Sequence, residues 1–180
     1  MSDIFSGGRL FNSDLSEWDI SRVTTLSGAF YGNHKLNADL SKWDTSKVTT
    51  LRSTFSHARI FNRDLSKWQV SKVTSLEYTF SNAFQFNGNL STWDISQTTS
   101  LQQTFFRASA FNSDISKLNS SNINLLALAF ANAHVFNADV SNWTTSKVTS
   151  LRQTFYGAEA FNADLSKWDV SKVIDAEKVF

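Results

Sequence analysis

Apolar side chains recur along this chain with a period of 25 residues, and the register holds from one end to the other. We number the positions of each copy from 1 to 25, so residues 1–10 occupy positions 16–25 of a preceding copy, and the last copy stops at position 20. A fixed period of this length is typical of a stacked-repeat architecture. Complete or partial copies begin at Phe11, Leu36, Phe61, Phe86, Phe111, Phe136 and Phe161.

Within each copy the apolar positions are 1, 5, 8, 10, 13, 16, 20 and 23, and their spacing changes halfway along. Positions 5 to 10, with Leu165 and Trp168 as examples, end in the alternation of a short β-strand. Positions 13 to 23, with Leu151, Phe155 and Ala158 as examples, step by three and four like an amphipathic helix. We therefore predict one short parallel strand and one helix of about two turns in each copy.

Residues near the predicted helix ends agree with this division. Thr74 with Glu77, and Thr99 with Gln102, are spaced as in a capping box at a helix start. Position 22 carries mostly glycine, asparagine and other residues that tolerate the left-handed conformation at a helix end. Stacked copies would then form a parallel sheet on one face and a row of helices on the other. A tryptophan column would run through the interior beside the phenylalanine columns at positions 1 and 20.

Polar residues also form columns when the copies are aligned. Asparagine holds position 2, and serine holds positions 6 and 11, in all seven copies. Aspartate holds position 4 in every copy but one, where Asn89 replaces it. These columns predict polar ladders, in which each aspartate accepts hydrogen bonds from turn amides. Calcium binding by the aspartate column is the alternative.

Composition excludes several classes of function. The net charge of +1 is spread over 180 residues, so no basic patch for nucleic acid is visible. No cysteine is present, no apolar run is long enough to span a bilayer, and the first residues lack the pattern of a signal peptide. We expect one repeat domain over residues 1–180, without a cofactor, metal site or membrane span.

The tract W-D-V-S-x-V-T, followed by x-F-x-x-A and F-N-x-D-L-S, recurs along the whole chain. It resembles the BspA-like leucine-rich-repeat surface proteins, especially the branch first catalogued as mycoplasma lipoproteins of unknown function and later recognised in bacteria and algae. The resemblance implies an α/β, leucine-rich-repeat-like solenoid. It also implies a cell-surface or secreted protein used for adhesion or partner binding, and it brings no catalytic residues.

Variable polar positions on the predicted strand identify a candidate binding face. Positions 7 and 9 should point outward between buried neighbours, and they carry lysines beside aspartates. Leucine-rich repeats commonly bind partners through this face, although a merely solvated surface is the alternative. The candidate residues are Lys42, Asp44, Lys67, Gln69, Asp94, Lys167 and Asp169.

The fifth copy departs from the pattern, because Leu118 replaces the tryptophan of position 8. Large apolar residues also occur there, and in the two preceding copies, at positions on the outer side of the predicted helices. They are candidates for an exposed patch that contacts a partner, with local repacking as the alternative. These residues are Tyr78, Phe106, Leu125 and Leu128.

The most favoured function is a non-enzymatic module that binds a protein or glycan at or outside the cell surface. Self-assembly by head-to-tail stacking into filaments or arrays is the alternative. Ice binding is a third and weaker hypothesis, suggested by a threonine file at position 14. The file comprises Thr24, Thr49, Thr74, Thr99 and Thr149. An enzyme is not expected, because the three histidines occur singly and no catalytic motif is present.

Overall fold

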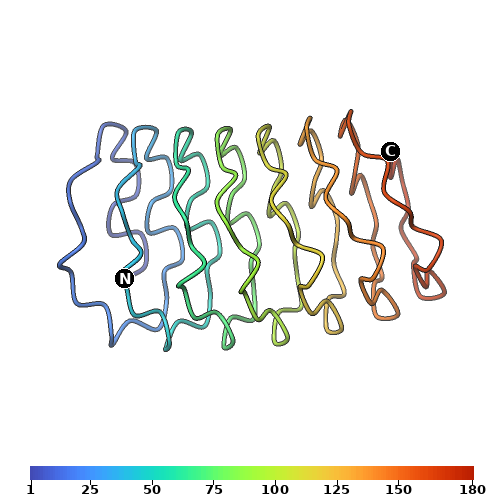
Figure 1. Cartoon of the computed structure of the whole chain (residues 1–180), viewed down its shortest axis with the longest axis horizontal. Coiled ribbons are helices and arrows are strands. Elements are labelled where there is room, and N and C mark those ends of the chain that lie inside the picture. The colour runs from blue at the N-terminus through green and yellow to red at the C-terminus, as the bar shows by residue number, and fades with distance from the viewer.

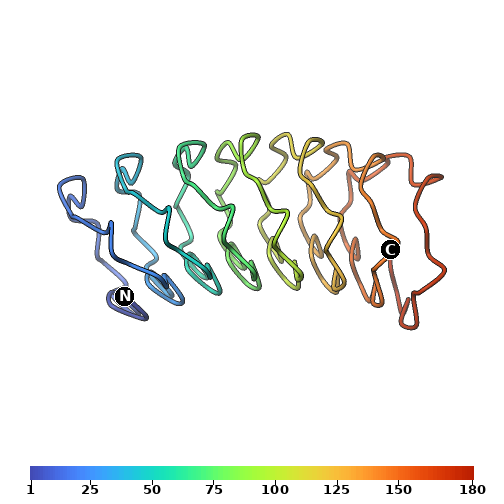
Figure 2. The same ribbon diagram turned by 90° about the horizontal axis from the view of Figure 1, so that it is seen from below.

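In the computed structural model, which describes residues 1–180, the backbone winds through coils that stack side by side (Figure 1). Each coil is one 25-residue copy: coil 1 is 11–35, coil 2 is 36–60, and the series continues to coil 7 at 161–180. Residues 1–10 form a partial coil before coil 1. A view turned by 90° shows the same single stack, with the two termini toward opposite ends (Figure 2).

The chain contains no α-helix and no extended β-strand. Its β-pairing consists of isolated parallel bridges at position 15 of adjacent coils, from Thr25 to Asp175. The predicted α/β solenoid, with one strand and one helix in each copy, is therefore wrong. The leucine-rich-repeat architecture that the resemblance implied is wrong for the same reason.

The predicted helix is absent because its backbone donors bond elsewhere. In coil 3, Tyr78 N–H donates to Gln102 O of the next coil at 3.0 Å, and Thr79 N–H donates three residues back to Leu76 O at 3.1 Å. Tyr78 and Asn82 have φ values of 59° and 58°. A positive φ at the third residue of a tight turn is the arrangement of a type II turn. Alternating turns and inter-coil bonds thus replace the helical i to i−4 pattern.

The apolar stripe nevertheless identifies the core correctly. Leu76, Phe80 and Ala83 at positions 16, 20 and 23 are 3% exposed or less. Consecutive tight turns bring every third or fourth side chain inward, as a helix does, so periodicity alone does not distinguish the two.

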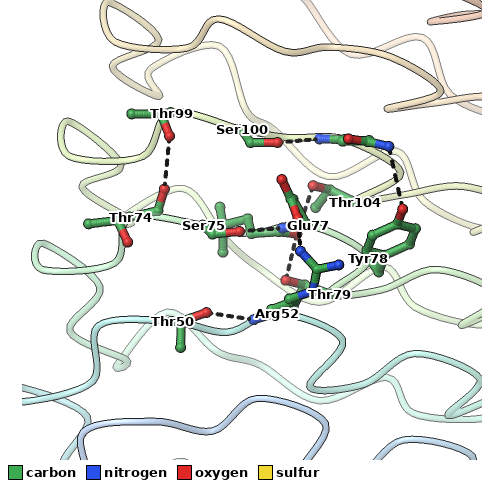
Figure 3. Close-up of polar contacts among 12 residues, drawn as sticks. Thr50, Arg52, Thr74, Ser75, Glu77, Tyr78, Thr79, Thr99, Ser100 and Thr104 are labelled. Carbon is green, nitrogen blue, oxygen red and sulfur yellow. Dashed lines mark hydrogen bonds and ion pairs between the residues drawn. The ribbon is translucent and has the colours of Figure 1, made fainter.

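The two predicted capping boxes are also wrong. Thr74 Oγ1 donates to Thr49 O at 3.3 Å, across the coils, instead of capping a helix. The N–H of Glu77 donates to Ser75 Oγ at 3.3 Å, and the Glu77 carboxylate pairs with Arg52 of the preceding coil (Figure 3).

Stacked aromatic rings fill the interior, as the sequence predicts. The phenylalanine column at position 20 runs from Phe5 to Phe180 with neighbouring ring centroids 5.4–5.9 Å apart. Its rings stack on the position 1 column, with Phe80 and Phe86 3.8 Å apart. Each tryptophan from coil 2 onward donates its indole N–H to the position 5 carbonyl of the preceding coil, at 3.0–3.2 Å.

Two of the predicted polar columns form the expected hydrogen bonds. At position 2, each asparagine Oδ1 accepts the N–H of the next asparagine at 2.7–3.1 Å, in an unbroken ladder. At position 4, each aspartate, and Asn89 likewise, accepts the N–H of the serine two residues on at 2.8–2.9 Å. The aspartate column is thus explained by turn hydrogen bonds. The position 6 and 11 serines are turn residues and do not form a ladder of their own.

Candidate binding face

The predicted strand at positions 5 to 10 is a pair of tight turns. In coil 3, Trp68 N–H donates to Leu65 O at 3.0 Å, and Val73 N–H donates to Val70 O at 2.8 Å. Position 7 lies within the first turn, and position 9 lies between the two turns. We call the surface formed by positions 7 and 9 of all coils the turn face. All seven candidate residues of the predicted strand face are exposed on it, though on turns instead of a strand.

The aspartates of the turn face are held in a fixed geometry. Asp44, Asp94 and Asp169 each accept the N–H of the serine two residues on at 2.9–3.0 Å. Hydrogen bonds from the side chain and backbone of that serine hold the pKa of each carboxyl below its ordinary value. These carboxylates are therefore charged at neutral pH.

The lysines of the turn face differ in their partners. Lys42 pairs with Glu17 at 2.7 Å, in an ion pair exposed to solvent. Lys167 Nζ donates to Asn142 Oδ1 at 3.4 Å. Lys67 makes no ion pair or side-chain hydrogen bond, so its ammonium group is the most available for a ligand.

Two hollows open on the turn face at equivalent places. The coil 3 hollow, of about 290 Å³, lies against Ser66–Ser71 together with Thr92 and Asp94 of coil 4. The coil 6 hollow, of about 270 Å³, lies against Ser141–Ser146 together with Lys167 and Asp169 of coil 7. In both, positions 6 to 11 of one coil form the floor and positions 7 and 9 of the next coil form a wall.

The hollows occur in the two coils that lack an aspartate or asparagine at position 9. Gln69 and Thr144 stand there, and neither folds back onto the following turn. The N–H groups of Ser71 and Ser146 consequently have no hydrogen-bond partner within the protein. In the other coils the same N–H is occupied by the position 9 side chain.

In both coils, a side-chain hydroxyl of the preceding coil forms hydrogen bonds with the backbone N–H and carbonyl of position 9. Thr45 Oγ1 accepts the N–H of Gln69 at 2.8 Å and donates to its carbonyl at 3.1 Å. Ser120 Oγ does the same for Thr144, at 2.7 and 3.3 Å. Sequence reasoning missed Thr45 and Ser120. The signal was the break in the position 9 column. A hydroxyl at position 10 is not specific, because Thr145 Oγ1 also donates to Asp169 O at 3.1 Å, where position 9 keeps its aspartate.

The structure brings five of the seven predicted residues into hollows. Lys67, Gln69 and Asp94 line the coil 3 hollow. Lys167 and Asp169 line the coil 6 hollow. The remaining two, Lys42 and Asp44, line neither.

The predicted apolar patch has a different setting from the one expected, because there is no helical face. Tyr78 and Leu128 occupy the positive-φ position 18, Leu125 is a bridge residue, and all four members are partly buried. Arg52 lies over the Tyr78 ring at 5.3 Å, and the Tyr78 hydroxyl accepts a bond from Gln102 at 3.4 Å (Figure 3). The patch is therefore partly covered by polar side chains, and its binding role stays a prediction.

The threonine file does not begin a helix either. Thr99 Oγ1 donates to the carbonyl of Thr74 at 3.4 Å, and the other threonines after Thr24 donate in the same way to the preceding coil (Figure 3). No cluster of three or more histidine, cysteine, aspartate or glutamate side chains is placed to hold a metal ion. No helix in the structure has the length and apolar character needed to cross a membrane.

No curated protein matches this chain. A family model described as "Mycoplasma protein of unknown function, DUF285" matches residues 1–113 and, in a second match, residues 78–180. Together the two matches cover the whole sequence, and the chain belongs to this family.

Proposed function

We propose that this member of the mycoplasma family is a non-enzymatic binding module that presents its turn face to a protein or glycan. One observation carries the proposal. Two hollows with the same construction recur on one face of a regular stack, at the two coils that depart from the repeat in the same way. A chance irregularity of the surface has no reason to recur with the same change at position 9.

The rigidity of the stack supports binding by a preformed surface. A single core of 44 buried residues underlies every coil, and the hydrogen bonds of Asp94 and Asp169 hold the hollow walls in place. Binding to a preorganised site avoids the entropy cost of ordering it. Both hollows lack histidine, and their aspartates are engaged in turns, which favours recognition over catalysis.

The repeat motifs support a location at the cell surface or outside the cell. Their resemblance to BspA-like surface proteins lies in the F-N-x-D-L-S and W-D-V-S-x-V-T tracts, and it suggests adhesion as the use of the module.

A binding screen with charge-reversed variants tests the proposal. The chain would be screened against immobilised cell-surface proteins and glycans, together with the variant Lys67→Glu/Lys167→Glu. Arg59→Glu/Arg107→Glu is the matched control, since it makes the same change of charge at exposed residues of positions 24 and 22. We expect the lysine variant to lose binding and the arginine variant to keep it. Equal loss in both, or no ligand for the parent chain, would contradict the proposal.

Self-association by head-to-tail stacking is the second candidate. Each coil joins the next through stacked rings, such as Phe130 and Phe155 at 5.7 Å, and through backbone hydrogen bonds, so the coil surfaces that meet are complementary to one another. Surfaces of this kind also favour the stacking of one copy on another. Light scattering over a range of concentrations tests this candidate, and a monomer at every concentration would rule it out.

A further inference from the structure

Resting on the proposed binding function, we propose that the coil 3 and coil 6 hollows are paired subsites for one linear, neutral polysaccharide. Each hollow takes one sugar ring of the same chain. The size of the hollows, the chemistry of their lining and their spacing all fit such a ligand.

The size of the hollows fits a small ring. Their volumes, about 290 and 270 Å³, lie just below the roughly 300 Å³ at which sites for drug-sized ligands begin. Each is shallow and open at the surface, so a ring that continues into a chain on both sides is not obstructed.

The chemistry of the walls fits sugar hydroxyls. In the coil 3 hollow, the Lys67 ammonium group and the free N–H of Ser71 are donors, and the Asp94 carboxylate is an acceptor. The coil 6 hollow offers the same three types of group, in Lys167, the free N–H of Ser146 and Asp169, although Lys167 lies in the wall whereas Lys67 lies in the floor. A hydroxyl both donates and accepts, so a ring with several hydroxyls can satisfy a mixed set of this kind. The presence of a carboxylate in each wall disfavours an anionic sugar.

The same walls are poorly suited to a protein partner. Hot spots of protein interfaces are aromatic or arginine anchors that fill well-packed, desolvated pockets. The tryptophans of the two floors, Trp68 and Trp143, are only 3% exposed, and most of the other lining residues are polar. An apolar side chain of a protein partner would therefore contact little apolar surface in either hollow.

The spacing of the hollows fits an extended chain. They lie three coils apart, and the ring centroids of Phe80, Phe105, Phe130 and Phe155 place three coil steps at about 17 Å. Both face the same side, because they occupy the same positions of their coils. A linear polysaccharide laid along the stack therefore meets both, and the second contact is intramolecular. Linking two contacts in this way raises overall affinity by about 100-fold or more when the linker matches the span.

Titration with oligosaccharides of increasing length tests the proposal. The probes are linear oligomers of glucose, mannose, galactose and N-acetylglucosamine, each from the monosaccharide upward, with binding followed by amide chemical shifts and calorimetry. We expect one series to bind weakly as the monomer, with shifts at Ser71 and Ser146. Affinity should then rise by at least about 100-fold at the length that reaches both hollows.

Two double variants each remove one hollow. They place valine at position 10 of one coil and aspartate at position 9 of the next, because most other coils have an aliphatic residue and an aspartate at these positions. Thr45→Val/Gln69→Asp converts the coil 3 hollow, and Ser120→Val/Thr144→Asp converts the coil 6 hollow. We expect either variant to abolish the gain with length while leaving binding at the other hollow. Arg107→Asn is the control, because asparagine occupies position 22 in the two neighbouring coils, and it should retain the full gain. Near-ultraviolet circular dichroism checks that each variant keeps the aromatic stack.

The outcomes separate the inference from the proposed function. If conversion of a hollow leaves the dependence on chain length unchanged, or if affinity does not depend on length, the paired-subsite inference is wrong. If no saccharide binds but both conversions abolish capture of a cell-surface protein, the face binds protein, and only the inference fails. If no saccharide and no protein binds the parent chain, the proposed function fails as well.

Discussion

The two parts of each coil are joined to their neighbours in different ways. At positions 14 to 25, neighbouring coils are joined by backbone hydrogen bonds as well as by side chains. All main-chain hydrogen bonds between coils lie in this part. At positions 1 to 13, only side chains cross between coils: the asparagine ladder, the tryptophan indoles, and hydroxyls such as that of Thr45. We call these the backbone-joined and side-chain-joined parts.

This difference explains which positions of the repeat vary in residue type. A backbone hydrogen bond does not depend on the side chain, so positions 15, 17, 18, 21 and 22 hold many residue types. A side-chain bond needs one residue type, so asparagine at position 2 and tryptophan at position 8 recur, and a break such as Leu118 is visible at once. The breaks at Gln69 and Thr144 leave the N–H groups of Ser71 and Ser146 free, while Thr45 and Ser120 add bonds to the backbone of Gln69 and Thr144.

The largest predicted effect is in the core that both parts share. Phe80 belongs to the backbone-joined part and stacks on Phe86 of the side-chain-joined part at 3.8 Å, with no exposed surface. Phe80→Ala should lower the free energy of unfolding by about 3–5 kcal/mol, because it leaves a cavity at this contact. Denaturant titration measures the change. Phe84→Ala is the control, since Phe84 is 38% exposed, and an equal loss there would contradict the explanation.

The second effect is confined to the side-chain-joined part. Trp93 is buried, and its indole N–H donates to Leu65 O at 3.0 Å. Trp93→Leu, which copies coil 5, should cost about 2–3 kcal/mol, because ring contacts and a hydrogen bond are both lost. Thermal and denaturant unfolding measure the cost. A change below about 0.5 kcal/mol would mean that the indole bond does not hold the coils together.

The reverse substitution should strengthen the stack. In coil 5, Leu118 leaves Leu90 O without the indole donor that the equivalent carbonyls receive. Leu118→Trp should raise the free energy of unfolding by about 1 kcal/mol by supplying that hydrogen bond. A loss of stability instead would indicate that Ser120 and its neighbours have repacked around leucine.

The contrast between the backbone-joined and side-chain-joined parts also determines how much of the fold can be predicted from the sequence. The core columns, the asparagine ladder and the aspartate turns were predicted correctly, because each depends on side-chain identity. The helix was predicted wrongly, because in the backbone-joined part the sequence specifies only which side chains face inward. Positive φ at position 18 has only a weak sequence signal, since glycine occurs there once, as Gly28, and residues such as Ser53 and Gln103 occupy it in other coils.

The candidate site shows a similar limit. Lys67, Asp94 and Asp169 are candidates because their columns are predicted to be exposed, and their binding role stays a prediction. The hollows themselves were not predicted, because the free N–H groups that follow Gln69 and Thr144 become visible only in the hydrogen bonds of the folded chain. Without the hydrogen bonds of Thr45 and Ser120, Gln69 and Thr144 are only exceptions in a column.

A smaller effect is expected in the backbone-joined part. Gln103 has a φ of 53°, which costs a non-glycine residue about 1–2 kcal/mol, and glycine relieves this strain at an entropy cost of about 0.5–1 kcal/mol. Gln103→Gly should therefore stabilise the chain by about 0.5 kcal/mol, and differential scanning calorimetry can detect the shift. The Gln103 N–H bond to Ala127 O is unaffected by the change. Clear destabilisation would show that the Gln103 side chain itself holds the coil.

The smallest effect concerns one carboxylate of the side-chain-joined part and depends on pH. Asp114 accepts the Ser116 N–H at 2.9 Å, and Asn89 accepts the Ser91 N–H in the same way, so Asp114→Asn should keep the turn. Hydrogen bonds from the Ser116 side chain and backbone hold the Asp114 pKa below its ordinary value of 3.8.

Because the folded state then binds the proton less readily than the unfolded state, this carboxylate stabilises the fold above pH 3.8. That contribution is lost as the pH falls through the lower pKa of the folded state. The parent chain should therefore be slightly more stable than Asp114→Asn at neutral pH, and the difference should vanish in acid. Unfolding curves of both chains between about pH 7 and pH 2 measure it. A difference that does not change with pH would mean that the turn depends on the geometry of the acceptor and not on its charge.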